Sequence, residues 1–363
     1  MAAPNSWKSK ASERVLKGER QPFEPVIGME AEFTLLVDGK AVRPERIFKA
    51  PKDVVRSEML PRAGRSRHLP SGGALYFDSG VIEVATPIIE LGERCAVRVA
   101  RSLWEQIAFL RGELDHHEER LGKKLQLEGF STHYNLTFTP GIERHGRSLP
   151  QLAILLAFLL PVPVMLLTAN RRTTGVGVRP RPGRLEVTAD FTPDPPLMTA
   201  AAAFIAGVVC EIMEWDTYRL AELEDRALPV IQSFWPCKHS TRKGWVARPF
   251  CFERNPYTAD VNESNWRLRD GRRLSLRRIA REIAKPFRES IRRMADEETF
   301  EHVFAVFDGR ARSLLDFEDR PAGYCDVGRT IRWTRRAARK LPRSRYEKVI
   351  HDVITRRRVR MGR

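Results

Sequence analysis

Two glutamates that stand two residues apart are the first feature of the sequence that could do chemistry. Glu30 and Glu32 lie in Gly28-Met-Glu-Ala-Glu-Phe33, within an apolar stretch from Val26 to Val37. In a β-strand, residues i and i+2 point to the same face, so both carboxylates would project from one side. Neighbouring carboxylates repel each other unless a cation lies between them. Such oxygen ligands suit Mg²⁺ or Mn²⁺, and the simpler alternative is two solvated glutamates on a polar face.

Acidic side chains recur in later apolar stretches. Asp78 and Glu83 lie in Tyr76-Phe-Asp-Ser-Gly-Val-Ile-Glu-Val-Ala-Thr-Pro87, and Glu186 also stands between two apolar residues. A glycine within a strand often marks a bend or a bulge, so Gly80 could bring Asp78 and Glu83 to one cleft. A carboxylate inside such an apolar run needs a partner, because an isolated buried charge is costly.

A histidine and a group of arginines complete the set. His133 and Asn135 alternate in a further strand-like segment, so both would face one side and could contact a phosphate or a metal; a lone strand histidine is more often structural. Five arginines crowd a Gly- and Pro-rich loop and the strand after it, where they could clamp phosphate or carboxylate groups. They are Arg171, Arg172, Arg179, Arg181 and Arg184. A solvated basic loop is the alternative interpretation of these arginines.

Together, four separate strands each present an acid or a histidine where the local pattern is apolar. ATP chemistry needs this combination: metal ligands for the triphosphate and cations for the charge that develops during phosphoryl transfer.

The elements that must position these residues follow from periodicity and turn signals. We expect a strand from Val26 to Val37 that turns back at Asp38-Gly39, a typical hairpin sequence. The further strands are expected at 74–87, at 124–139 with a kink at Gly129, and at 183–190, with a loop at 171–183. Helices are expected at 93–121, 151–160, 196–226, 277–294 and 340–356, and a hairpin turn at Asp270-Gly271. The pattern predicts an α+β fold with a curved, mainly antiparallel sheet and helices on its other face.

Composition limits the class of protein. The chain has 363 residues, 42% of them hydrophobic, and a net charge of +17, which points to polyanionic partners or to a solvated arginine-rich surface. Five cysteines lie far apart and form no C-x-x-C pair, which favours free thiols in the cytoplasm over a disulfide scaffold or structural zinc. The polar N-terminus has no apolar segment typical of a secretory signal. Residues 149–169 are uncharged, but two prolines interrupt them, so we expect a buried helix at 151–160 followed by an extended piece rather than a membrane span.

Four short motifs, in order, resemble the glutamine synthetase and glutamate–cysteine ligase superfamily over roughly residues 25–290. The segment that opens at Gly28 is similar to its G-x-E-x-E-F motif. Gly73 to Pro87 resembles the tyrosine–aspartate segment of the Pup ligase and Pup deamidase branch, and Thr132-His-Tyr-Asn135 resembles the histidine–asparagine strand of that branch. Arg184-Leu-Glu186 is similar to the late R-x-E strand of the superfamily.

The resemblance implies an open half-barrel that holds ATP and Mg²⁺ or Mn²⁺, with helices on its convex face. The implied metal ligands are Glu30, Glu32, Tyr76, Glu83, His133 and Glu186. Asp78 would act as base or nucleophile, and Arg184 would act at the transferred phosphate. His133 and Asn135 would join the five arginines around the nucleotide. The implied organisation is a flexible lead (1–20), a catalytic domain (21–300) and a basic, largely helical C-terminal extension (301–363).

The reaction expected from the resemblance is ATP-dependent ligation of a carboxylate to an amine through an acyl phosphate, as in a glutamate–cysteine ligase-like enzyme. Glutamate, a peptide or a protein side chain could supply the carboxylate. One alternative is an amidase or depupylase-like hydrolase that keeps a bound nucleotide and uses Asp78 against the amide. Another is a non-catalytic nucleotide-binding or nucleic-acid-binding protein that uses the basic tail, residues 333–363.

Overall fold

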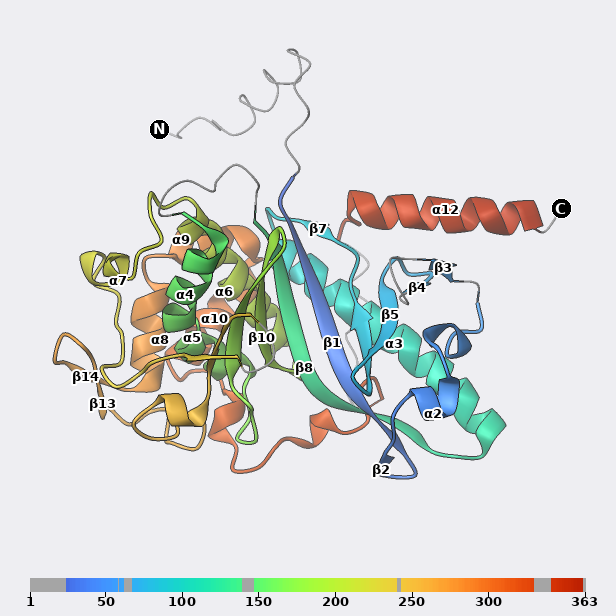
Figure 1. Cartoon of the computed structure of the whole chain (residues 1–363), viewed down its shortest axis with the longest axis horizontal. Helices are drawn as coiled ribbons and strands as arrows, with labels where there is room; N and C mark the ends of the chain where they lie inside the picture. Colours follow the sequence, from blue (N-terminus) through green and yellow to red (C-terminus); the bar gives the residue numbers. More distant parts are fainter. Residues whose placement is uncertain are drawn as a thin grey trace, which may run out of the picture.

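A large antiparallel sheet runs through the middle of the molecule, with helices packed against it (Figure 1). The computed structural model describes residues 24–57, 59–61, 67–138, 147–239, 243–329 and 341–361. The predicted flexible lead, residues 1–20, lies outside this part of the chain. The strands of the large sheet are β1 (Val26–Val37), β2 (Lys40–Ala41), β3 (Leu60–Pro61), β4 (Arg67–His68), β5 (Ala74–Asp78), β6 (Val81–Ala85), β7 (Ile89–Glu90), β8 (Leu125–Thr137), β9 (Val176–Arg181), β10 (Arg184–Asp190), β11 (Cys237–Lys238) and β12 (Trp245–Ala247).

The strand order is β11-β12-β9-β10-β8-β1-β6-β5-β4-β3, and β2 and β7 also pair with β1. Among the described residues the sheet does not close on itself, which confirms a large, open, mainly antiparallel sheet. A separate small hairpin, β13 (Trp266–Arg267) and β14 (Arg273–Leu274), turns at the predicted Asp270-Gly271.

Strand β1 explains how the sheet divides into two faces. Ile27, Met29 and the residues that alternate with them up to Val37 are buried, whereas Glu30 is only half-buried. The apolar face is therefore the one that the helices cover, and the acidic residues lie on the other face. The predicted turn after β1 is confirmed, since Val37 pairs with Lys40 and both residues between them have positive φ.

The longer helices are α3 (Cys95–Leu121), α4 (Leu149–Leu159), α5 (Pro161–Thr168), α6 (Pro195–Met213), α8 (Leu276–Ala284), α9 (Arg288–Met294), α10 (Glu297–Phe307) and α12 (Arg345–Met361); α2 (Glu45–Phe48) and α7 (Ala221–Asp225) are short. Helix α3 packs against β1, β6 and β8, and α4 and α5 pack against β9 and β10. As predicted, α3 ends at Gly122, whose φ of 62° is the left-handed conformation that terminates helices.

Three helix predictions were wrong in extent, each because of a proline or a turn. Residues 161–168 form a second helix rather than an extended piece, because Pro161 is tolerated in the first turn of α5. The helix predicted at 196–226 ends at Met213, and only the short α7 follows. The helix predicted at 277–294 breaks after Ala284 at Lys285-Pro286 and continues as α9.

Two strand predictions also needed correction. The segment 74–87 is not one strand but the hairpin β5–β6, because Ser79 and Gly80 both adopt positive φ and reverse the chain. The loop predicted at 171–183 contains strand β9, so Arg179 and Arg181 lie on a strand. Pro180 in β9 faces no ladder partner on β12, whose pairing with β9 stops at Val178, so the proline removes no hydrogen bond there.

Helix α6 is long and apolar enough to cross a membrane. The bent pair α4–α5 would also be long and apolar enough if the two helices were counted as one span. Of the apolar window of α6, 83% is buried inside the protein, and α4 meets α5 at a bend of 63°. Burial of this kind is typical of core helices.

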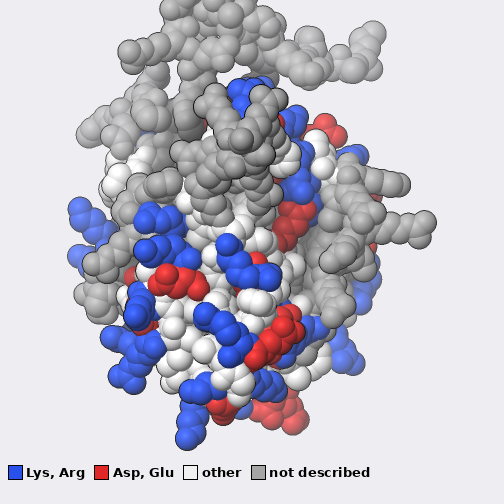
Figure 2. All heavy atoms as spheres, turned by 90° about the vertical axis from the view of Figure 1, so that its right-hand side faces the viewer, with Lys and Arg blue, Asp and Glu red and all other residues white. Residues whose placement is uncertain are grey.

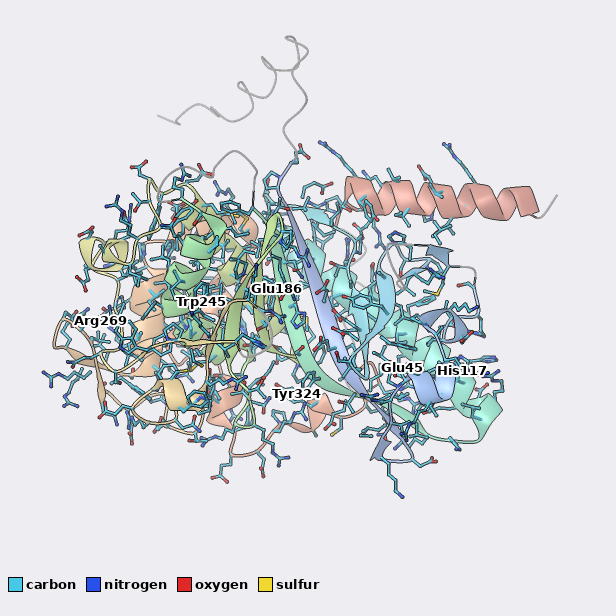
Figure 3. All side chains as sticks on the ribbon, in the orientation of Figure 1. Glu45, His117, Glu186, Trp245, Arg269 and Tyr324 are labelled. Carbon is cyan, nitrogen blue, oxygen red and sulfur yellow. The ribbon has the colours of Figure 1, made fainter. Side chains whose placement is uncertain are left out.

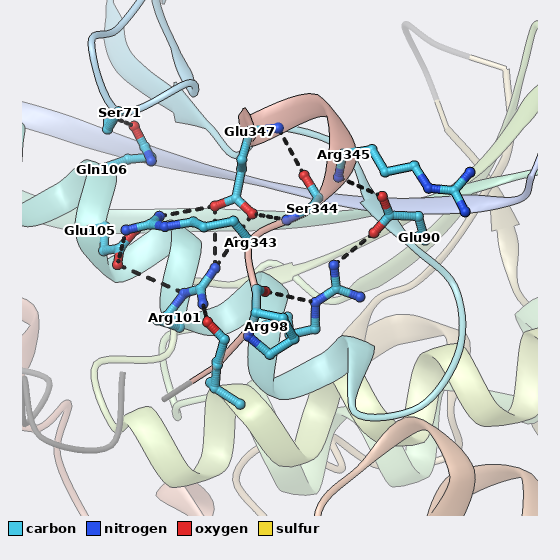
Figure 4. Close-up of polar contacts among 12 residues, drawn as sticks. Ser71, Glu90, Arg98, Arg101, Glu105, Gln106, Arg343, Ser344, Arg345 and Glu347 are labelled. Carbon is cyan, nitrogen blue, oxygen red and sulfur yellow. Dashed lines mark hydrogen bonds and ion pairs between the residues drawn. The ribbon is translucent and has the colours of Figure 1, made fainter. Parts of the chain in front are cut away.

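The C-terminal helix α12 is fastened to α3 by an ion-pair network (Figure 4). Glu347 lies 3.2 Å from Arg101 of α3 and 3.0 Å from Arg343, and its other carboxylate oxygen accepts the Ser344 backbone N–H at 2.6 Å. Ile350 and Ile354 pack on Leu60 beside the sheet. The predicted C-terminal helix is thus confirmed. The boundary predicted between residues 300 and 301 falls inside helix α10. The division of the chain into domains stays a prediction.

Candidate active site

Six adjacent strands bring most of the predicted residues to one face of the sheet. In the first row across it, Tyr76 of β5 stands opposite Glu83 of β6, Glu83 opposite Glu32 of β1, and Glu32 opposite Ser131 of β8. The Tyr76 hydroxyl donates a hydrogen bond to Glu83, and the Ser131 hydroxyl donates one to Glu32 at 2.5 Å. Residues distant in sequence thus meet because antiparallel register aligns them.

Two further rows lie beside the first. Glu30 stands opposite His133, and Asn135 stands opposite Glu186 of β10, which faces Arg179 of β9. Nδ1 of His133 lies 3.4 Å from a Glu30 carboxylate oxygen. His133 and Asn135, both on β8, therefore lie on one face of the sheet, as predicted.

A β-bulge in β8 keeps these rows in register. The pairing with β1 shifts between Glu32, opposite Ser131, and Phe33, opposite Gly129, so Phe130 is the extra residue. Gly129 is required there, because a Cβ would lie 2.5 Å from the Phe191 ring. Without the bulge, Ser131 and His133 would project from the helix-covered face.

Within the part of the chain that the structure describes, two groups of side chains could hold a metal ion. One consists of Glu30, Glu83 and His133, and the other of Glu32, Asp78 and Glu83; within each group the donor atoms lie within 4.8 Å of one another. The Ser79-Gly80 turn brings Asp78 and Glu83 into one group, as predicted, although it does so as a hairpin and not as a bend. Glu83 belongs to both groups.

Burial and neighbouring charges shift the pKa values of three of these side chains. Burial and the charge of Glu30 raise the pKa of Glu83 to about 9, and burial together with Glu30 and Glu83 raises the pKa of Tyr76 far above its ordinary value. Burial also acts to raise the pKa of Glu30, but the hydrogen bond and charge of His133 outweigh it and lower that pKa to about 2.

This arrangement fits a hard divalent cation. Carboxylate oxygens are the ligands that Mg²⁺ prefers, and the imidazole of His133 makes Mn²⁺ equally suitable. A cation among these acids would replace the proton that Glu83 otherwise retains.

The arginines of β9 and β10 form the cationic side of the face. Arg179 is buried and makes an ion pair with Glu186, and Arg181 lies 3.3 Å from the same carboxylate. Arg184 donates a hydrogen bond to Asn135 at 2.8 Å. Glu186, which lies near the middle of the sheet in Figure 3, belongs to neither possible metal group, so its predicted role as a ligand stays a prediction.

The two arginines before β9 make contacts with later segments of the chain. Arg171 donates hydrogen bonds to the carbonyls of Phe317 (2.7 Å) and Thr258 (3.1 Å), so it fastens its loop to later segments. Arg172 is exposed, lies 3.5 Å from Asp319 and borders the cavity described next.

A cavity of about 620 Å³ opens beside the acids, bordered by Glu32, Asp78, His133 and Arg179. The cavity is also bordered by residues that the motifs did not identify. They are Phe130, Ser131, Asn170, Asp190, His239 and Arg320. The alternation of β8 and β10 could have placed Ser131 and Asp190 on this face. His239 and Arg320 come from segments without regular pattern, and no local signal points to them.

Asp190, which borders the cavity, is bonded to the loop before β9. One of its carboxylate oxygens accepts hydrogen bonds from the backbone N–H and the side-chain amide of Asn170, at 3.0 and 2.9 Å, and the other accepts one from the Thr173 hydroxyl. Burial nevertheless raises the pKa of Asp190 to about 6.

Comparison with known proteins gives matches among solved structures alone. No protein-family model and no curated protein matches the chain. The complex between the prokaryotic ubiquitin-like protein Pup and its ligase PafA is similar over 79% of this chain and 65% of that chain, at 14% identity and a TM-score of 0.44. PafA in complex with ADP is similar over 73% and 64%, at 14% identity and a TM-score of 0.39. The chain spans less than two thirds of either solved chain.

Proposed function

We propose that the protein is an ATP- and Mg²⁺-dependent ligase that joins a carboxylate to an amine and forms a γ-glutamyl or isopeptide amide through an acyl phosphate. The observation that carries the proposal is the pair of acidic groups that share Glu83, beside a cavity that Arg179 also borders. Phosphoryl transfer from ATP uses both kinds of group: acids that hold the metal ion, and arginines that stabilise the charge on the transferred phosphoryl group. We further propose that the sheet curves as a half-barrel around the nucleotide.

The chain's own residues would divide the work. The acidic groups would hold Mg²⁺, which neutralises charge on the transferred phosphoryl group when bound. Arg184 would contact the phosphates, and Glu186 would hold Arg179 and Arg181 in orientation through their ion pairs. The substrate carboxylate would attack the γ-phosphate of ATP and release ADP. An amine would then attack the acyl carbon and displace phosphate, and Asp78 would take the proton from that amine.

The test measures ADP and phosphate release by the purified chain with Mg·ATP and a panel of glutamate, other amino acids, peptides and polyamines. We expect one acid–amine pair to stimulate release and yield an amide, and Glu30→Gln to abolish both. Glu297→Gln, an exposed acid on α10, is the matched control and should leave the rate unchanged. Nucleotide turnover that survives Glu30→Gln would refute the proposal, and amide cleavage without ADP would favour the hydrolase.

A further inference from the structure

Two cysteines lie against each other at the β11 edge of the sheet. Cys237 opens β11, and Cys251 ends the 3₁₀ turn Pro249–Cys251; their Sγ atoms are 3.1 Å apart. Both thiols point at one carbonyl, that of Val246 in β12, at 3.2 and 3.5 Å. Residues fourteen positions apart therefore bring their sulfur atoms together over a single peptide group.

Backbone pairing holds the two thiols in this position. Cys237 pairs with Val246 across β11 and β12, and the Trp235 N–H donates to the Cys251 carbonyl at 3.2 Å. The Cys251 N–H in turn donates to the carbonyl of Arg248 at 2.9 Å. Since a disulfide bond is about 2.05 Å long, the sulfur atoms need to move only about 1 Å closer to bond.

The other cysteines are placed differently. Burial raises the pKa of Cys95 to about 11 and that of Cys210 to about 12, which removes nearly all thiolate at neutral pH. Cys325 is exposed. Cys237 is half-buried, and burial and the neighbouring Cys251 raise its pKa too, so we expect its reaction with an oxidant to be slow.

We propose that Cys237 and Cys251 form a redox-sensitive dithiol, which a hydroperoxide converts into an intramolecular disulfide. The Cys237 thiolate attacks a peroxide oxygen, the O–O bond breaks, and a sulfenic acid forms as hydroxide leaves. The Cys251 sulfur then attacks the Cys237 sulfur, the S–O bond breaks, and water leaves. Overall the two thiols lose two electrons and two protons, and hydrogen peroxide is reduced to two molecules of water.

The disulfide would close a ring over residues 237–251, which reaches the wall of the cavity. His239, two residues after Cys237, borders the cavity, and β12 pairs with β9, the strand that carries Arg179. Oxidation would therefore fix the edge of the sheet beside the cavity. The inference does not rest on the proposed ligase function.

The test treats the full-length, reduced protein with hydrogen peroxide, blocks remaining thiols with an alkylating agent and maps tryptic peptides without reduction. We expect one cross-linked peptide that joins Cys237 to Cys251, a mass loss of about 2 Da before alkylation, and recovery on adding dithiothreitol. Cys237→Ser and Cys251→Ser should each abolish the cross-link, and Cys325→Ser should leave it unchanged.

Two outcomes would overturn the proposal. One is oxidation at Cys325 or over-oxidation of Cys237 with no cross-linked peptide; because this is read from the wild-type chain, it does not depend on how the variants fold. The other is a cross-link between two copies of the chain in place of one within the chain. Hydrogen exchange across residues 237–251 should also slow on oxidation, and unchanged exchange would refute the rigid edge.

Discussion

Glu83 lies where the two acidic groups meet, and its pKa of about 9 means that it carries a proton at neutral pH. A metal ion that binds there must displace this proton. We therefore expect the affinity for Mg²⁺ or Mn²⁺ to rise with pH and to level off above about pH 9. Below pH 9, each unit by which the pH rises should lower the dissociation constant by up to about tenfold.

Calorimetric titration with Mn²⁺ across this pH range, in buffers of different ionisation enthalpy, measures both the affinity and the proton released. Glu83→Gln should bind more weakly and lose most of the pH dependence, because no proton then competes at that position. An affinity that is flat with pH in the wild-type chain would show that Glu83 is not a ligand.

The buried ion pair between Arg179 and Glu186 makes a second prediction at this scale. Arg179→Met would leave Glu186, whose side chain is 2% exposed, with Arg181 as its remaining cation. We expect a loss of about 3 kcal/mol in the free energy of unfolding, measured with denaturant. Arg181→Met is the matched control and should cost about 1 kcal/mol or less, because this side chain is 31% exposed. Equal losses in the two variants would contradict the argument.

At the scale of the elements, period-two alternation was enough to place the acids of β1 and the His133–Asn135 pair on one face. It could not reveal which strands are neighbours, because pairing depends on contacts between distant segments. Nor did it detect the β5–β6 hairpin. Ser79 adopts positive φ although it is not a glycine, and Gly80 alone predicts a bend or a bulge within one strand. The sequence predicts a loop for the arginines of β9, because proline is rare within strands. The structure shows why Pro180 is tolerated: the pairing of β9 with β12 ends at Val178.

The β5–β6 turn makes a prediction of its own. Gly80 has a φ of +94°, and an added Cβ would lie 3.3 Å from Nε of Arg43. We expect Gly80→Ala to cost about 1–2 kcal/mol of stability through strain in the turn. It should also weaken metal binding, because Asp78 and Glu83 flank the turn. Gly92→Ala, where no atom lies within 4 Å of the added Cβ, is the control and should be neutral in thermal unfolding and metal titration. A neutral Gly80→Ala would show that the turn tolerates the side chain.

At the scale of the whole molecule, the net charge of +17 does not gather into one surface on the face that Figure 2 shows. Lysine and arginine side chains there are interspersed with aspartate and glutamate. Many arginines instead make ion pairs within the fold. Arg101 of α3 and Arg343, just before α12, for example, both pair with Glu105 and Glu347. Sequence composition could not distinguish these structural arginines from a surface that binds nucleic acid, because both raise the net charge equally.

The network at Glu347 predicts that α12 is part of the fold and not a detachable basic tail. The side chains of Arg101 and Glu347 are 1% and 2% exposed, so removing the negative charge leaves a buried guanidinium whose nearest remaining carboxylate, that of Glu105, is 3.8 Å away. We expect Glu347→Gln to lower the free energy of unfolding by about 3 kcal/mol and to increase hydrogen exchange in residues 345–361. Glu297→Gln, which alters an exposed ion pair, should change neither. The opposite result would be faster hydrogen exchange in α12 alone, with the free energy of unfolding unchanged. That result would show that α12 can detach without destabilising the sheet.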